Sequence, residues 1–175
     1  MTAARRAART RTGKPRSLDE VLAYKNPKVI WRFQDKFALA ARDAKDLFRE
    51  TLRWLWACAT SRALGGPALH IRHSMTLLDE MWHEFILFTQ DYTEFCDRYL
   101  GGYIHHQPAT RLEKQAFRRG YRRHPARMRE QEEASLVEQF RFLRDHVGER
   151  VLEKWIRGYR AKYTPARINE LRIPY

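Results

Sequence analysis

Five of the seven histidines fall within 37 residues, in a stretch that also carries carboxylates: His70, His73, His83, His105 and His106. Asp79 and His83 are four residues apart, so on a helix both side chains project from one face, as a pair of metal ligands must. The His105-His106 doublet can supply further imidazole ligands. We therefore predict a mononuclear site for Zn, Fe or Mn made by Asp79, His83, His105 and His106.

Several better-known signatures are absent from the chain. Glu80-x-x-His83 has the spacing of carboxylate-bridged di-iron bundles, but such bundles need two of these motifs and only one is present. HExxH, a Walker A loop, GxGxxG and GxSxG are also missing, which disfavours the common zinc proteases, nucleotide binding and serine hydrolases. If the metal keeps an open position, Glu80 or Glu84 is the expected base.

The helix that carries His83 sets a condition on this site. If residues 76–100 form one straight helix, His83 lies roughly 27 Å from Gly101 at 1.5 Å per residue. The few residues after Gly102 then span only about 13–18 Å, so His105 and His106 could not reach back to His83. The histidines meet only if the helix breaks near Thr89, where Thr89 or Asp91 can cap a second helix. The alternative is that these histidines and Trp82 have only a structural role, in the core of a protein-interaction module.

Helical spacing recurs along the chain, and no stretch alternates apolar and polar residues as a strand does. Ser17 and Glu20 form a capping box, and Gly65-Gly66-Pro67 and Gly101-Gly102 are stop signals. We predict an all-α fold, a compact bundle of five to seven helices in a single domain over residues 17–175. The expected helices cover about 17–25, 28–37, 42–63, 75–100, 132–145 and 151–163.

The two cysteines are expected in the core. Cys58 and Cys96 both lie on apolar helical stripes, so neither is a good nucleophile or ligand. Two cysteines are too few for a disulfide scaffold and suit a reducing compartment. With no apolar run near the roughly 20 residues that cross a bilayer, a soluble cytoplasmic protein is predicted.

The net charge of +13 is unevenly distributed. Residues 1–16 carry six basic groups and no acid, and we predict a disordered tail there, with organellar import as an alternative role. Residues 17–106 are close to neutral, with 11 basic and 12 acidic groups. Residues 107–130 carry eight basic and two acidic groups. The charge therefore indicates a possible partner and does not describe the histidine site.

The second basic segment, residues 111–129, interleaves arginine with aromatic residues. On a helix its cations follow one face and its flanks, and they are Arg111, Lys114, Arg118, Arg119, Arg122 and Arg123. Arginines beside Phe117 and Tyr121 suit phosphate contacts with base stacking, so nucleic acid is one predicted partner of this segment together with the basic tail, residues 1–16. The alternatives are an acidic protein partner and a solvated basic loop.

Residues 78–108 carry a recurring pattern: an Asp, then Trp-His, Thr, Tyr, Phe-Cys, Gly and a closing His-His-x-Pro. The matching positions are Asp79, Trp82, His83, Thr89, Tyr92, Phe95, Cys96, Gly101, His105, His106 and Pro108. This pattern resembles the glycine-rich-domain-containing-protein-like family, whose domains occur in bacteria, fungi and plants. The resemblance implies a joint role for Trp82-His83 and His105-His106, with a break near Thr89, and it implies no activity.

Overall fold

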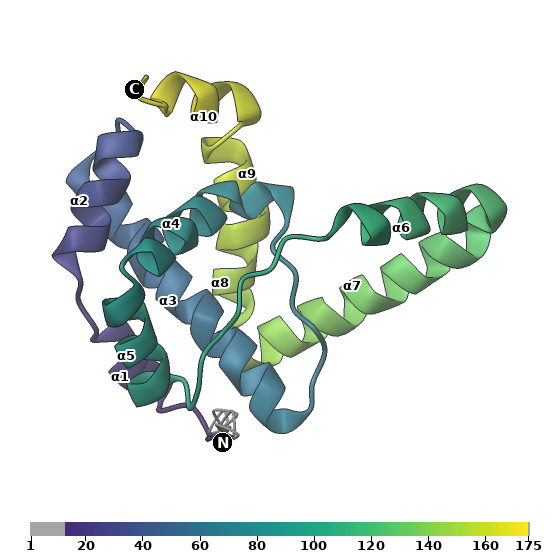
Figure 1. Ribbon diagram of the computed structural model, residues 1–175, viewed down its shortest axis with the longest axis horizontal. Helices are drawn as coiled ribbons and strands as arrows, with labels where there is room; N and C mark the ends of the chain where they lie inside the picture. The colour runs from purple at the N-terminus through teal and green to yellow at the C-terminus, as the bar shows by residue number, and fades with distance from the viewer. Residues whose placement is uncertain (1–12, 175) are drawn as a thin grey trace, which may run out of the picture.

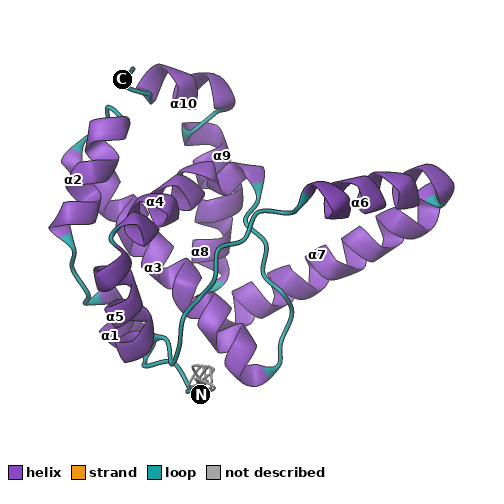
Figure 2. Ribbon diagram, in the orientation of Figure 1, coloured by secondary structure: helices purple, strands orange, loops and turns teal. Residues whose placement is uncertain are grey.

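The computed structural model describes residues 13–174 and shows an all-α protein, as the sequence predicts (Figures 1 and 2). Over this range no strand forms, and the one β-bridge joins Phe37 to Arg172. The α-helices are α1 (Leu18–Leu22), α2 (Pro27–Lys36), α3 (Ala41–Leu64), α4 (Thr76–Leu87), α5 (Thr89–Tyr99), α6 (Arg111–Arg123), α7 (Pro125–Val147), α8 (Glu149–Glu153), α9 (Tyr159–Lys162) and α10 (Pro165–Leu171).

Helix α3 is the centre of the fold. Half of its length is buried, with Leu47, Leu52 and Leu55 on the predicted apolar stripe. It packs against α1, α2, α4 and α7. The helix ends at Gly65, whose φ of 63° is a left-handed conformation that glycine adopts at little cost. In the described part of the chain, neither α3 nor any other helix has a long enough apolar stretch to cross a membrane.

The N-terminal segment joins the body earlier than predicted. The capping box of Ser17 and Glu20 is confirmed at the start of α1. Just before it, the Gly13 amide donates to the carbonyl of Gly101 at 2.7 Å, and Trp56 Nε1 donates to the carbonyl of Arg16 at 2.9 Å. Residues 13–16 of the predicted tail are thus held against α3 and α5, and residues 1–12 lie outside the described residues.

The predicted helix over 75–100 is two helices, preceded by a 3₁₀ turn at His73–Met75. The break falls at Phe88, one residue before the expected position, with φ −84° and ψ 66°. Neither Thr89 nor Asp91 caps α5. The carboxylate of Asp91 instead accepts a hydrogen bond from Asn26 and forms an ion pair with Lys28. Side chains from the start of α2 therefore use the carboxylate that the sequence suggested as a cap.

Helices α6 and α7 form an antiparallel hairpin that projects from the body (Figure 1). We define the arm as residues 111–138, all of α6 and the first half of α7. No residue of the arm is buried, whereas the second half of α7 buries Gln139, Leu143 and Val147 against the body. The basic segment is thus a helical arm and not a loop, and α7 begins earlier than the predicted residue 132.

The C-terminal region closes over α3 through buried polar contacts. Helices α8 and α9 are joined by a π-helical turn over Lys154–Gly158, which places Trp155 in the core. Trp155 Nε1 donates to the carboxylate of Glu50 at 2.9 Å, and Lys154 Nζ lies 3.2 Å from it. Glu50 is 4% exposed, so its carboxylate is buried together with these donors.

Candidate metal centre

Two segments bring the candidate ligands together. Asp79 and His83 stand one turn apart on α4, and His106 comes from the extended segment that follows α5. The chain reverses at Gly101 and Gly102, which have φ values of 69° and 142° that side chains with a Cβ rarely adopt. This reversal sends residues 103–106 back along α5 towards α4 (Figure 1).

Hydrogen bonds fix the returning segment. The guanidinium of Arg62 donates to the carbonyls of Leu100, Gly102 and Tyr103 at 3.1, 3.2 and 2.8 Å. At the next residue of this segment, the carbonyl of Ile104 accepts a hydrogen bond from the hydroxyl of Tyr92 at 2.7 Å. The position of the segment relative to α4 is therefore set by side chains from α3 and α5.

Tyr92 also fixes Trp82, and Trp82 supports the ring of His106. Trp82 Nε1 donates to the Tyr92 hydroxyl at 2.9 Å. Burial raises the pKa of Tyr92 well above its usual range, so the phenol keeps the proton that it donates to Ile104. The Trp82 and His106 rings pack with their centroids 4.2 Å apart. The sequence pattern contains both aromatic residues, but it does not show that Tyr92 fixes Trp82 and that Trp82 in turn packs against His106.

Asp79, His83 and His106 form one cluster. His106 Nε2 lies 2.8 Å from Asp79 Oδ1, and His83 Nδ1 lies 3.9 Å from Asp79 Oδ2. The two imidazole rings are 4.5 Å apart between centroids. One ligand atom from each residue lies within 4.8 Å of the other two. Two imidazole nitrogens and one carboxylate oxygen in this arrangement form a donor set that suits a divalent transition metal.

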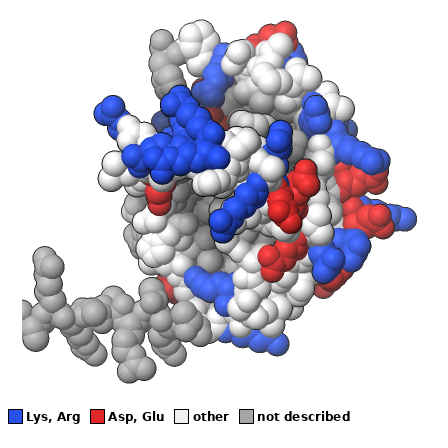
Figure 3. Space-filling model, turned by 90° about the vertical axis from the view of Figure 1, so that its right-hand side faces the viewer, with Lys and Arg blue, Asp and Glu red and all other residues white. Residues whose placement is uncertain are grey.

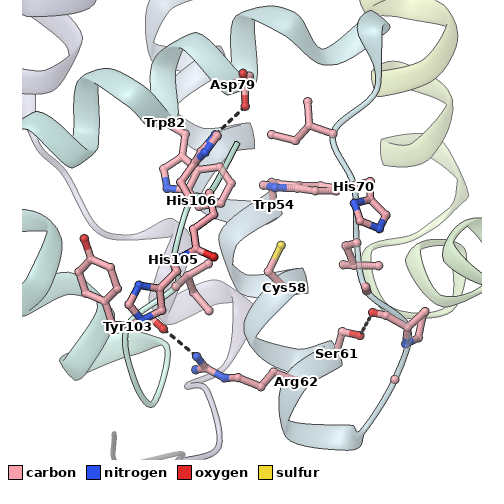
Figure 4. A pocket seen from close by; sticks show the side chains of 17 residues that line it. Trp54, Cys58, Ser61, Arg62, His70, Asp79, Trp82, Tyr103, His105 and His106 are labelled. Atoms are coloured by element: carbon pink, nitrogen blue, oxygen red, sulfur yellow. Dashed lines mark hydrogen bonds and ion pairs between the residues drawn. The ribbon is translucent and has the colours of Figure 1, made fainter. Parts of the chain in front are cut away.

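The fourth predicted ligand, His105, does not join this cluster. Its ring packs on Tyr103, with 4.8 Å between centroids, and is exposed (Figure 4). In an extended segment neighbouring side chains point to opposite sides. His106 therefore points towards Asp79, while His105 points away from the cluster and lines another part of the same cavity. The structure thus brings together three of the four residues that the sequence selected.

A cavity of about 570 Å³ lies beside the cluster (Figure 4). Asp79, Trp82 and His106 line one side of it, and Trp54 and His70 lie across from them. Cys58 also lines the cavity, but burial raises the pKa of its thiol to about 12, so it stays protonated and is a poor ligand. The cavity gives small molecules a route to two of the three clustered residues.

The two glutamates suggested as bases are used elsewhere. Lys36 Nζ lies 2.8 Å from Glu80 and 2.9 Å from Glu84, and Arg172 also pairs with Glu80. Neither glutamate lines the cavity. The expected role of Glu80 or Glu84 as a base gains no support from this arrangement, because Lys36 pairs with both carboxylates and Arg172 with that of Glu80.

The predicted nucleic-acid-binding residues lie apart from this site. Arg111, Lys114, Arg118, Arg119, Arg122 and Arg123 are all exposed on α6, in the arm. None of them lines the cavity beside Asp79. The histidine cluster and the basic helix are therefore two separate features of the molecule.

A family model described as UCP032817-like matches residues 20–143 of the chain. This span holds all three clustered residues and the whole arm. It corrects the resemblance drawn from residues 78–108, because the matching family is not the glycine-rich one. No curated protein and no solved structure matches the chain.

Proposed function

The chain belongs to the UCP032817-like family, and we propose that it binds one divalent metal ion through Asp79, His83 and His106. The observation that carries this proposal is the convergence of one carboxylate and two imidazoles within 4.8 Å. Nothing else in the described residues pairs with Asp79: its ion-pair partners are the two histidines alone. A carboxylate without a lysine or arginine partner can serve a metal ion.

Three protein ligands leave coordination positions for water or a small molecule, as in catalytic rather than structural sites. The cavity of about 570 Å³ adjoins Asp79 and His106 and can hold such a molecule. A bound ion would supply Lewis acidity at this position. Trp82 and Tyr92 would hold the His106 ring in place, and Asp79 is the one carboxylate among the described residues that line the cavity.

Metal analysis of the full chain tests the proposal. The protein is stripped with a chelator, incubated with Zn²⁺, Fe²⁺ or Mn²⁺, desalted and measured by elemental analysis and titration calorimetry. We expect one ion per chain for at least one of these metals. His106→Ala and Asp79→Asn should weaken binding by more than the roughly 10–100-fold that loss of a supporting residue causes.

His105→Ala is the matched control, since it removes a neighbouring histidine that points away from the cluster. It should keep the stoichiometry and affinity of the parent, and circular dichroism should show that all variants remain helical. Absence of a stoichiometric ion under these conditions would refute the proposal. Equal losses for His105→Ala and His106→Ala would also contradict it.

A further inference from the structure

Helix α6 concentrates cations that form no ion pair within the described residues. None of the six basic residues of α6 lies within ion-pair distance of a carboxylate there. The body uses many of its cations in pairs, from Arg16 with Glu20 to Arg172 with Glu80. Figure 3 shows the side of the molecule from which the arm projects, where groups of lysine and arginine side chains stand out, some of them beside acidic side chains.

This clustering is unfavourable for the helix by itself. Lys114 and Arg118, Arg118 and Arg122, and Arg119 and Arg123 are each four residues apart, so like charges face each other along α6. The helix is held by a capping box of Thr110 and Glu113, by Phe117 against Tyr121, and by packing on α7, where Gly120 leaves room for the side chain of Met128. A polyanion laid along α6 would relieve the repulsion, whereas a second positively charged arm would add to it.

The arm also exposes apolar side chains, and this feature favours a single strand. Phe117 is 46% exposed and lies 5.6 Å from Tyr121 between ring centroids. Lys114 precedes Phe117 by three residues and Tyr121 by seven, so a cation and two rings share one side of the helix. Unpaired bases stack on such rings while the cations contact phosphates, but bases in a duplex are not free to do so.

We propose that the arm, residues 111–138, binds single-stranded nucleic acid through the phosphate-contacting cations of α6 and stacking on Phe117. The bases would meet Phe117 and Tyr121, and the backbone would follow Lys114, Arg118 and Arg122. Binding of this kind has little sequence preference, because every base has a face that stacks and every nucleotide a phosphate.

Fluorescence anisotropy of the full chain with a labelled oligouridine of about 20 nucleotides tests this proposal. The arm variant changes Arg118, Arg119, Arg122 and Arg123 to Gln. The control variant changes four exposed body cations that have no ion pair in the described range to Gln: Lys45, Arg49, Arg150 and Arg160. Both lose four charges, so any effect of net charge is the same.

We expect the arm variant to raise Kd at least about tenfold at 0.1 M salt and to flatten the salt dependence by roughly 0.7 per lost phosphate contact. The control variant should change Kd by less than about twofold. Phe117→Ala should weaken binding roughly fivefold or more, with Val137→Ala, another exposed apolar residue of the arm, as its control.

Equal losses for the two quadruple variants would overturn the proposal, because net charge alone would then explain binding. Equal affinity for a duplex of the same length would overturn the preference for a single strand. Binding to anionic phospholipid vesicles or to polyglutamate, without binding to oligouridine, would assign the arm to a membrane surface or an acidic protein instead.

Discussion

The body and the arm place their charged side chains in opposite ways. In the body, Glu50 is buried among Arg53, Lys154 and Trp155, and Glu84 is buried against Lys36. In the arm, every cation of α6 is exposed and none is paired with an acid of the described chain. A paired, buried carboxylate fixes one helix against another. An exposed, unpaired cation fixes nothing within the molecule and remains free for a partner.

The same contrast separates the two candidate functional regions. The histidine cluster depends on side chains held in place by buried hydrogen bonds, with Tyr92 linking Trp82 to Ile104. The arm depends on the number and sign of its charges, and its apolar residues Leu112 and Val137 are more than half exposed. Single substitutions of its ligands should therefore affect the cluster strongly, whereas in the arm the loss of one cation should matter little and the loss of several at once should matter more.

The largest expected effect comes from Glu50→Ala. This change leaves the charge of Arg53 and the buried N–H of Trp155 without their acceptor, while Lys154 keeps its ion pair with Asp46, so the free energy of unfolding should fall by about 3–5 kcal/mol. Glu138→Ala, at an exposed position of the arm, should change it by less than about 0.5 kcal/mol. Urea unfolding followed by circular dichroism measures both. Similar losses for the two variants would remove the distinction between body and arm.

A smaller effect is expected for Tyr92→Phe, which deletes only one hydroxyl. Trp82 Nε1 loses its acceptor and the Ile104 carbonyl its donor, which should cost about 1–3 kcal/mol of stability. The metal affinity of the cluster should fall roughly tenfold. The segment that carries His106 would lose its anchor at Ile104, two residues earlier, but all three ligands would remain. Calorimetric titration of the folded variant checks this. Unchanged affinity would show that Tyr92 does not position His106.

The smallest effect concerns pH and the break between α4 and α5. Hydrogen bonds from Lys28 and Asn26 hold the pKa of Asp91 below its usual range. The stabilisation is therefore fully present above the unfolded pKa of about 4 and is lost as pH falls through the lower folded value. Asp91→Asn should lower the melting temperature slightly at pH 7 and flatten its decline below about pH 4. A variant as acid-sensitive as the parent would contradict this.

Much of the local structure could be predicted from the sequence, since it depends on neighbours in the chain. The capping box at Ser17, the extent of α3 and the shared face of Asp79 and His83 all follow from spacing. The capping box of Thr110 and Glu113 was visible in the same way and marks the start of α6. The contacts of Asp91 with Lys28 and Asn26 were not predictable, because those two residues lie at the start of α2, far away in the sequence.

By itself, the sequence determined an all-α fold, a carboxylate and a histidine on one helical face, and an unusual concentration of arginines after residue 110. Only the tertiary structure decided that His106 joins Asp79 and His83 while His105 turns away. Two adjacent histidines are equivalent in a linear pattern. They differ once Arg62 and Tyr92 fix the direction of the returning segment, since an extended backbone can turn only one of them towards α4.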